Sequence, residues 1–296
     1  MKIESLQMFC RVVERKSITE TAKEAYLSQP AVTKQIRNLE MYYNAKLFNR
    51  EHSKLVLTEP GRILYNYAKE IIAIERDAYE SVQLHQNNVH QTLHIGASPT
   101  IGEYLLPSLI GKFRDEHFDV KFNLTISNTP NIINALEENR VDIALVESVF
   151  SQTQFKQQHF YKDKLSLVVS NEHPWKDRGE IELKEIIGER MIWRESESGM
   201  RQLLESFLVQ EGILEQMDET IELGSVQAIK SAVEAGLGIS ILPSLTTEKE
   251  IEFRSLHTVQ IRAFQITRDF MIVQKDRRFK KDIVRYFEKF LLNLNK

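Results

Sequence analysis

Two short helical patterns separated by a tight break lie within residues 17–40, and this feature constrains the fold more than any other. Ser17 is placed to cap the first helix, because its hydroxyl can accept a hydrogen bond from a free backbone N–H. Ala22, Ala25 and Leu27 are expected to form the small apolar face of that helix. The pattern therefore predicts a short first helix that packs on a neighbour.

The second helix opens at Ser28-Gln29-Pro30, where proline is favourable because the first helical turn leaves its N–H positions unpaired. Val32, Ile36 and Leu39 recur at helical spacing and are expected to face inward. The opposite face carries side chains of the types that read base edges and hold phosphates: Gln29, Thr33, Lys34 and Arg37. Two short helices of this kind predict a DNA-binding helix-turn-helix, and the alternative is a helical hairpin with a merely solvated outer face.

The residues after the second helix favour the DNA-binding interpretation. Residues 45–50 end a third element, and residues 53–58 alternate as a short strand, which predicts a winged helix with Arg50 and Lys54 at the wing. Residues 1–62 hold 11 Lys and Arg against 7 Asp and Glu, whereas the remaining residues carry a net charge of −7. The basic charge therefore coincides with the motif that would contact DNA.

At this point the chain resembles the LysR-type transcriptional regulators, a large bacterial family. The resemblance rests on the order LQMF…SITETAKEAYLSQPAVTKQIRNLE…KLFNR…LTEPG and extends over essentially all 296 residues. It implies a DNA-binding transcriptional regulator, and not an enzyme, whose partner is promoter double-stranded DNA. The residues expected to contact that DNA are Gln29, Pro30, Thr33, Lys34, Arg37, Arg50 and Lys54.

The bulk properties are those of an ordinary soluble protein, with 42% hydrophobic and 27% charged residues. The sequence has no apolar run of 18 residues and no apolar leader, so we expect a cytoplasmic protein without a membrane segment. Cys10 shares a helical stripe with apolar residues and is expected to be a buried thiol, with redox sensing as the alternative. The histidines are scattered singly, so we expect no metal site and no cofactor other than a small-molecule effector.

Residues 60–87 read as one long helix. Its apolar residues recur in steps of three and four, which predicts a narrow coiled-coil seam: Leu64, Tyr67, Ile71, Ile74, Ala78 and Val82. A seam on such a helix needs a partner, and the simplest partner is a second copy of the chain, although packing on its own domain is the alternative. We therefore expect a dimer through residues 60–87, assembled into a homotetramer, with a polar hinge at residues 85–90.

After the hinge, strands alternate with helices, which predicts parallel-sheet units, among them a helix over about 101–116 and a second series of elements whose first strand begins at residue 164. A last strand at residues 269–273 and a C-terminal helix at 282–293 need a place in the first unit, so the chain is expected to cross back. The predicted fold is α/β with an all-α head: a winged helix-turn-helix (1–59), a linker helix (60–87) and an effector-binding domain (91–296). That domain resembles the two-subdomain periplasmic solute-binding fold, with subdomain I at 91–161 and 268–296 and subdomain II at 162–267.

Polar residues follow the predicted strands of this domain, where free N–H groups of helix N-termini favour anions. We expect the residues that bind the effector, between the two subdomains, to be Ser98, Thr100, Asn128, Thr129, Glu147, Ser196, Ser198, Arg201 and Ser225. The alternative for each hydroxyl or amide is that it only caps a helix. By the family resemblance, Thr100 and Thr129 match effector-contacting positions most closely, and Ser198 comes next.

The segment GASPTIGEYLLPSL resembles members that regulate sulfur assimilation or carbon fixation. The later segment RESESGMR lacks the proline and one glycine of the run that those members have there. Glu147 is a carboxylate at a position where an anion would be repelled. We therefore expect a small anionic effector, and a cationic or zwitterionic ligand stays open.

Other classes of protein explain less of the sequence. Residues 96–99 lack the second glycine of a nucleophile elbow, and residues 234–238 lack the third glycine of a dinucleotide fingerprint. A solute-binding protein would need an export signal, and a purely architectural DNA protein would leave the cleft unexplained. Activation of divergent operons and repression of its own gene are what the family resemblance implies, and RNA polymerase is a candidate further partner.

Overall fold

The computed structural model describes residues 2–51, 54–85, 91–147, 155–217, 220–276 and 280–294. Its contacts divide the chain into two compact units, residues 1–91 with 277–281 and residues 92–276 with 282–296. Each unit is described separately. Most of the predicted hinge at residues 85–90 lies outside the described residues. Ser148, which follows Glu147, also lies outside them.

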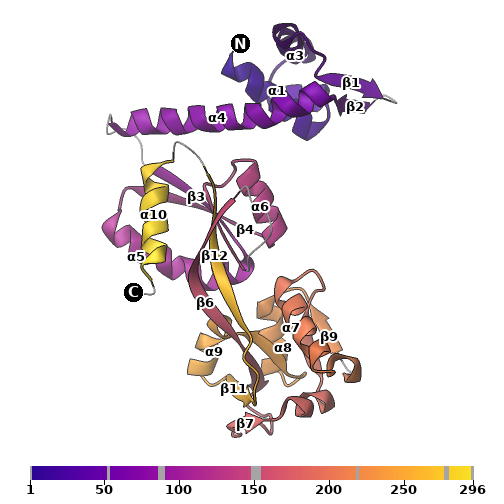
Figure 1. The fold of residues 1–296 in the computed structure, drawn as a ribbon, viewed down its shortest axis with the longest axis vertical. Helices are drawn as coiled ribbons and strands as arrows, with labels where there is room; N and C mark the ends of the chain where they lie inside the picture. The colour runs from indigo at the N-terminus through magenta and orange to yellow at the C-terminus, as the bar shows by residue number, and fades with distance from the viewer. Residues whose placement is uncertain are drawn as a thin grey trace. The chain divides into compact units, whose positions relative to one another are not determined.

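The first unit is a helical head with a two-stranded wing, followed by one long helix (Figure 1). Its elements are α1 (Ile3–Arg15), α2 (Ile18–Glu24), α3 (Gln29–Tyr43), β1 (Phe48–Glu51), β2 (Lys54–Leu57) and α4 (Glu59–His85). The predicted caps are present, since the Ser17 hydroxyl accepts from Glu20 N at 3.2 Å and the Ser28 hydroxyl from Ala31 N at 3.3 Å. The sequence predicted one wing strand, but residues 48–51 form a second one that pairs antiparallel with β2.

The core of the head is formed by α1, α3 and the first turns of α4. Val32, Ile36 and Leu39 are buried as predicted. The prediction for Leu27 was wrong, because α2 ends at Glu24 and Leu27 lies in the following turn with 42% of its surface exposed. Cys10 is buried, and burial raises its pKa from 9.0 to about 12. A thiol of this kind is a poor nucleophile at neutral pH.

The predicted seam of α4 is divided between two environments. Leu64 is buried in the core of the head and Ile71 packs against the same core, so these two residues serve the chain's own fold. The side chains of Tyr67, Ile74 and Val82 remain 67%, 49% and 57% exposed. Ile74 and Val82 thus lie uncovered beyond the residues of α4 that pack on the head, and Tyr67 is uncovered among those residues.

The second unit is built on one mixed sheet that passes through both subdomains. Within the described residues the strand order is β4-β3-β5-β12-β6-β11-β7, with β10 pairing β6, and β8 and β9 form a small parallel sheet. The strands are β3 (Gln91–Ala97), β4 (Val120–Ile126), β5 (Ile143–Glu147), β6 (Phe155–Ser170), β7 (Glu180–Ile181), β8 (Met191–Arg194), β9 (Thr220–Leu223), β10 (Ser240–Pro243), β11 (Leu256–Ile261) and β12 (Thr267–Lys275). The predicted parallel units are present, since β3 pairs parallel with β5 and β8 pairs parallel with β9, while the returning strand β12 runs antiparallel to both β5 and β6.

The helices of this unit cover the sheet surfaces. They are η1 (Ile101–Leu105), α5 (Leu106–Glu116), α6 (Thr129–Glu137), η2 (Leu183–Gly188), α7 (Gly199–Gln210), η3 (Leu214–Gln216), α8 (Val226–Glu234), η4 (Ser244–Thr246), α9 (Glu248–Glu252) and α10 (Asp282–Leu292). The sequence predicted one regular helix over residues 101–116, but its first turn is a π-helix. Pro107 lies just inside α5 and cannot donate the hydrogen bond that a regular helix would need there.

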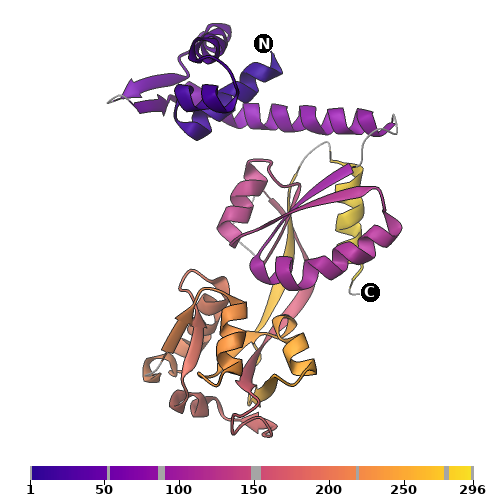
Figure 2. The same ribbon diagram turned by 180° about the vertical axis from the view of Figure 1, so that it is seen from behind.

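Two long strands connect the subdomains. In Figures 1 and 2, β6 and β12 run side by side from one subdomain to the other, and residues 155–164 pair with residues 267–275. The sequence predicted a crossing here, but it placed the start of the first strand at residue 164. Separate buried clusters form the cores of the two subdomains, which gives each a core of its own on either side of these strands.

Candidate DNA interface and effector site

The polar face predicted for the recognition helix is exposed on α3. Gln29, Pro30, Lys34 and Arg37 are exposed and Thr33 is partly exposed, while the buried residues of α3 lie on the opposite face. Among the described residues, no carboxylate pairs with Lys34 or Arg37, in contrast to Arg15, whose guanidinium lies 2.7 Å from Glu24. The helix thus presents two uncompensated cations beside groups that can hydrogen-bond, which is the chemistry of a DNA-contacting surface.

The recognition helix begins beside a groove of the same unit. This groove has a volume of about 840 Å³ and is lined by Gln29, by the α1–α2 turn (Lys16–Thr19) and by β2 residues 55–57, among others. The structure therefore brings Gln29 and the wing together. For the predicted wing residues Arg50 and Lys54, the structure describes the backbone, which lies in the β1–β2 pairing as Arg50↔Leu55 and Glu51↔Lys54.

Sequence reasoning missed Tyr26 in the turn between α2 and α3. Its side chain is 97% exposed, and its backbone has φ +54°, which is uncommon for a residue other than glycine, asparagine or aspartate. An aromatic residue held in this conformation beside the recognition helix is a further candidate for contact with DNA.

In subdomain I, the predicted effector residues gather at the carboxyl ends of three neighbouring strands. Ser98 follows β3, and its hydroxyl donates to Glu147 Oε1, 3.3 Å away at the end of β5. Ser127 N donates to Ala97 O at 3.2 Å, which brings the end of β4 to the same edge. The hydroxyls and the carboxylate therefore converge because the strand ends do.

Helix capping, the alternative to effector binding, applies to some of these residues and not to others. Asn128 caps α6, since its Oδ1 accepts from Asn131 N at 3.1 Å, and Thr129 is the first helical residue and does not cap. Thr100 precedes η1 and is buried, but its hydroxyl makes no cap hydrogen bond. Capping thus accounts for Asn128, and it does not account for the two threonines.

In subdomain II, the predicted residues lie around the N-termini of α7 and α8. The Ser225 hydroxyl caps α8 by accepting from Ala228 N at 3.1 Å, whereas Ser198 precedes α7 without a side-chain cap bond. Ser196 is exposed, and its backbone carbonyl accepts from Gln202 at 3.4 Å. Within the described ranges, no hydrogen bond or ion pair links this group to the group in subdomain I.

Arg201 was expected to bind the effector, and its Nε and Nη1 already hydrogen-bond within the protein. Its guanidinium lies 2.6 Å from Glu205 and 2.5 Å from Glu222, and it also donates to Arg194 O at 2.7 Å. These hydrogen bonds raise the pKa of Arg201 and keep it cationic. A guanidinium neutralised by two carboxylates contributes little attraction for an anion.

Sequence reasoning also missed Arg268, the cation next to the first group. Its Nη1 lies 2.7 Å from Glu147 Oε2, and its Nε and Nη2 donate to Asp163 Oδ2 at 3.1 and 2.9 Å. The Nη1 contact is an ion pair without the alignment of a hydrogen bond, since that atom has no hydrogen-bond acceptor. Glu147, Arg268 and Asp163 lie on β5, β12 and β6, so this triad joins subdomain I to the crossing strands.

A second contact ties the start of η1–α5 to subdomain II. Lys230 on α8 is buried, donates to Thr246 O at 2.9 Å and to Glu250 at 2.6 Å, and lies 4.9 Å from the ring centroid of Tyr104. Tyr104 belongs to η1, a few residues after Thr100. A displacement of η1 would therefore change the contact between Tyr104 and Lys230 of subdomain II.

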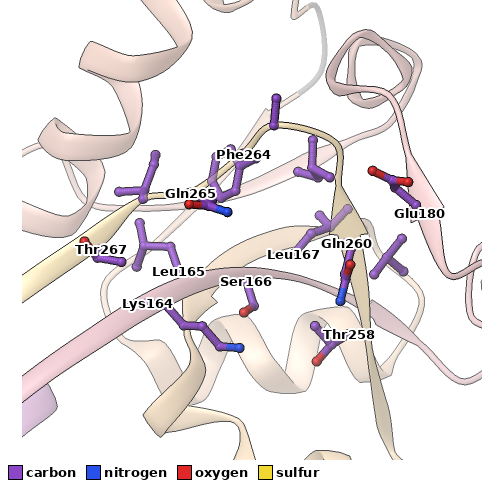
Figure 3. Close-up of a pocket in the computed structure, with 14 residues that line it drawn as sticks. Lys164, Leu165, Ser166, Leu167, Glu180, Thr258, Gln260, Phe264, Gln265 and Thr267 are labelled. Carbon is purple, nitrogen blue, oxygen red and sulfur yellow. The ribbon is translucent and has the colours of Figure 1, made fainter.

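A separate hollow lies where β6 changes partner from β12 to β11. Residues 260–266 arch over Leu165 and Ser166, and Figure 3 shows Phe264 and Gln265 on this arch. The hollow has a volume of about 460 Å³. None of the predicted effector residues lines it, so it is distinct from the strand-end site.

Among the described residues, no helix combines the length and apolar character needed to cross a membrane. In the same part of the chain, no cluster of histidine, cysteine, aspartate and glutamate could hold a metal ion.

Two family models match this chain. Residues 3–62 match the model for the bacterial regulatory helix-turn-helix protein of the lysR family, and residues 86–295 match the LysR substrate binding domain. A probable RuBisCO transcriptional regulator of Cyanidioschyzon merolae is 31% identical over 296 residues, covering 99% of this chain and 98% of the relative. The HTH-type transcriptional regulator CysL of Bacillus subtilis is 31% identical, covering 90% and 89%.

Among solved structures, the CcmR regulatory domain of Synechocystis PCC6803 in complex with 2-PG is similar in fold. It has a TM-score of 0.62 and 24% identity, and covers 70% of this chain and 98% of that chain.

Proposed function

The chain belongs to the LysR family of transcriptional regulators, and from that premise we propose that it reads operator DNA as a dimer under the control of a small anionic metabolite. In this proposal residues 1–59 bind DNA, residues 60–87 dimerise and residues 91–296 bind the effector. DNA binding through the helix-turn-helix and possession of an effector-binding domain are properties of the family. What we propose for this chain in particular is which residues contact the DNA and the effector, which class of ligand binds, and how the chains assemble.

For DNA, we propose that Gln29, Pro30, Thr33, Lys34 and Arg37 enter the major groove, with Arg50 and Lys54 on the backbone. The observation that carries this is the exposed face of α3 with its two cations uncompensated among the described residues. Arg37→Ala is expected to cost about 1–3 kcal/mol of operator binding and to relax specificity at one base pair. Lys54→Ala is expected to weaken all sequences about equally and to reduce the salt dependence.

A footprinting titration at two salt concentrations checks both effects. If both variants protect the operator as the unmodified protein does, at both salt concentrations, the assignment of α3 and the wing is wrong. The exposed Lys23→Ala serves as the control, because it removes a cation of the head outside the proposed interface.

For the effector, we propose that Thr100 and Thr129 bind an acid group at the strand ends, beside Ser98. The single observation that carries this is that neither threonine hydroxyl caps its helix, while Asn128 next to Thr129 does. Helix N-termini at this edge supply N–H groups and a favourable dipole for an anion. Arg268 pairs with Glu147 and so reduces the repulsion that the sequence alone suggested, but it does not cancel that repulsion, because Arg268 also pairs with Asp163.

The test compares Thr→Ala with Thr→Ser at both positions. The alanine double variant is expected to lose the response of operator protection to 2-phosphoglycolate, phosphate, sulfate or dicarboxylates, while the serine double variant keeps it. Operator binding without effector should persist in both. An unchanged response in the Thr100→Ala, Thr129→Ala protein would place the sensing site elsewhere.

The seam of α4 supports the proposed dimer, because Tyr67, Ile74 and Val82 leave an uncovered apolar face on the helix. Two copies would present two recognition helices to two half-sites. From membership of the family we also propose that two such dimers form a tetramer and that the protein contacts RNA polymerase.

A further inference from the structure

The charges around Arg268 do not balance. Arg268 pairs with two carboxylates, Glu147 and Asp163, and the three side chains are 3%, 16% and 4% exposed, respectively. The other buried cations of this unit pair with one carboxylate each, Arg194 with Glu195 and Lys230 with Glu250. The triad therefore retains one negative charge in a poorly solvated place, where an unmatched charge is costly.

The unmatched charge belongs mainly to Glu147. Asp163 accepts two guanidinium hydrogen bonds from Arg268 at 3.1 and 2.9 Å and one from Leu245 N at 3.4 Å. Glu147 accepts one hydrogen bond, the 3.3 Å contact from the Ser98 hydroxyl, and its ion pair with Arg268 is poorly aligned. Glu147 is also the most exposed of the three, and it lies at the strand-end edge.

We propose that Glu147 binds an ammonium group of the effector, so that the ligand is a zwitterion with an acid group and an amino group. This inference rests on the proposed acid-binding role of Thr100 and Thr129. The ammonium supplies the cation that the triad lacks, and its three N–H donors match the free acceptor positions of the carboxylate. The acid group occupies the N–H groups and hydroxyls at the neighbouring strand ends, on the other side of Ser98.

The experiment uses pairs of acids that differ only in an ammonium against a hydroxyl. The probes are O-phospho-L-serine with 3-phospho-L-glycerate, L-aspartate with L-malate, L-serine with L-glycerate and L-alanine with L-lactate, titrated calorimetrically into the full-length protein. In at least one pair, the amino acid is expected to bind about tenfold more tightly than its hydroxy partner, because a charge-assisted hydrogen bond is replaced by a neutral one. Glu147→Gln should remove that difference, and the hydroxy partner should bind as tightly as before or more tightly, because the substitution removes a negative charge near its acid group.

Glu103→Gln is the matched control, because Glu103 is an exposed carboxylate on η1 of the same subdomain and should not alter the ratio. Thermal unfolding of each variant establishes that it is folded, and the paired titrations of the unmodified protein test the inference without any substitution.

Three results would overturn the inference. If a hydroxy acid binds as well as or better than its amino partner in every pair, and requires Thr100 and Thr129, the anion site stands and the ammonium site is wrong. If an amino acid is preferred but Glu147→Gln keeps the preference, Glu147 is not its partner. If no acid in either series binds, the ammonium site and the proposed anion site fall together.

Discussion

The hydroxyl of Thr33 donates a hydrogen bond to the backbone carbonyl oxygen of Gln29, 2.9 Å away and one helical turn earlier. The hydroxyl proton is thus used within α3, and we expect the Cγ2 methyl group to be the part of Thr33 that contacts a base, such as the methyl group of thymine. Thr33→Val keeps that methyl group and should bind the operator within about threefold of the unmodified protein. Thr33→Ser loses it and should cost about 1 kcal/mol, the value of one buried methyl group.

Electrophoretic mobility shifts with the operator, at fixed salt, measure both variants. The opposite order, with serine tolerated and valine not, would mean that the hydroxyl accepts a hydrogen bond from DNA.

Some apolar residues of α4 are exposed and others pack on the head, so different substitutions test the proposed dimer and the stability of the head. Ile74→Ala with Val82→Ala removes exposed apolar surface and should shift sedimentation toward smaller species, since the proposed dimer would bury both side chains. A fully buried isoleucine truncated to alanine costs roughly 2–5 kcal/mol. Ile71→Ala is the comparison, because Ile71 packs against the head's own core and its loss should lower thermal stability. An unchanged sedimentation coefficient and normal operator affinity in the double variant would mean that this face packs elsewhere.

Burial of Cys10 predicts an unreactive thiol. Its pKa is raised to about 12, with burial the largest cause and Glu14 the next, so the thiolate is scarce at pH 8. N-ethylmaleimide should label the native protein slowly and the urea-unfolded protein rapidly. In linkage terms, the native thiol holds its proton above the unfolded pKa of 9.0, so the chain loses stability as the pH rises from about 9 toward 12. Cys10→Ala should reduce that loss, and rapid native labelling at pH 8 would restore the redox-sensing alternative.

Removal of Arg268 should destabilise the second unit strongly. Arg268→Met leaves two buried carboxylates without their cation, which costs roughly 3–5 kcal/mol by analogy with other broken buried pairs. Both tryptophans, Trp175 and Trp193, lie in this unit, so their fluorescence during urea unfolding reports it directly. The matched control is Arg178→Met, which breaks an exposed ion pair with Glu185 and should change the unfolding midpoint much less, because solvent screens an exposed pair. Equal losses in the two variants would show that the triad contributes no more than a surface pair.

Local signals in the sequence predicted much of this protein correctly. The recognition helix, the caps at Ser17 and Ser28 and the long helix α4 follow from residues a few positions apart, because capping and helical periodicity are short-range effects. The position of Ser98 after a buried strand has the same origin. Boundaries were less well predicted where a proline changed the helix type, at residues 101–106, or where one strand served two subdomains, as β6 does.

The tertiary structure alone decided which of the candidate side chains are available. Arg201 and Glu147 both resembled ligand-binding residues in the sequence, but Glu222, the second carboxylate on Arg201, lies 21 residues away, and Arg268, the cation beside Glu147, lies more than a hundred away. The charge of Arg201 is neutralised because two carboxylates pair with it. The charge of Glu147 is not neutralised, because Glu147 shares Arg268 with Asp163. Neither outcome follows from the local sequence. The sequence determined the family, the elements and the chemical types present at the strand ends, because these depend on near neighbours. The charge balance depends on contacts between β5, β6 and β12, which exist only once the chain has crossed between its subdomains.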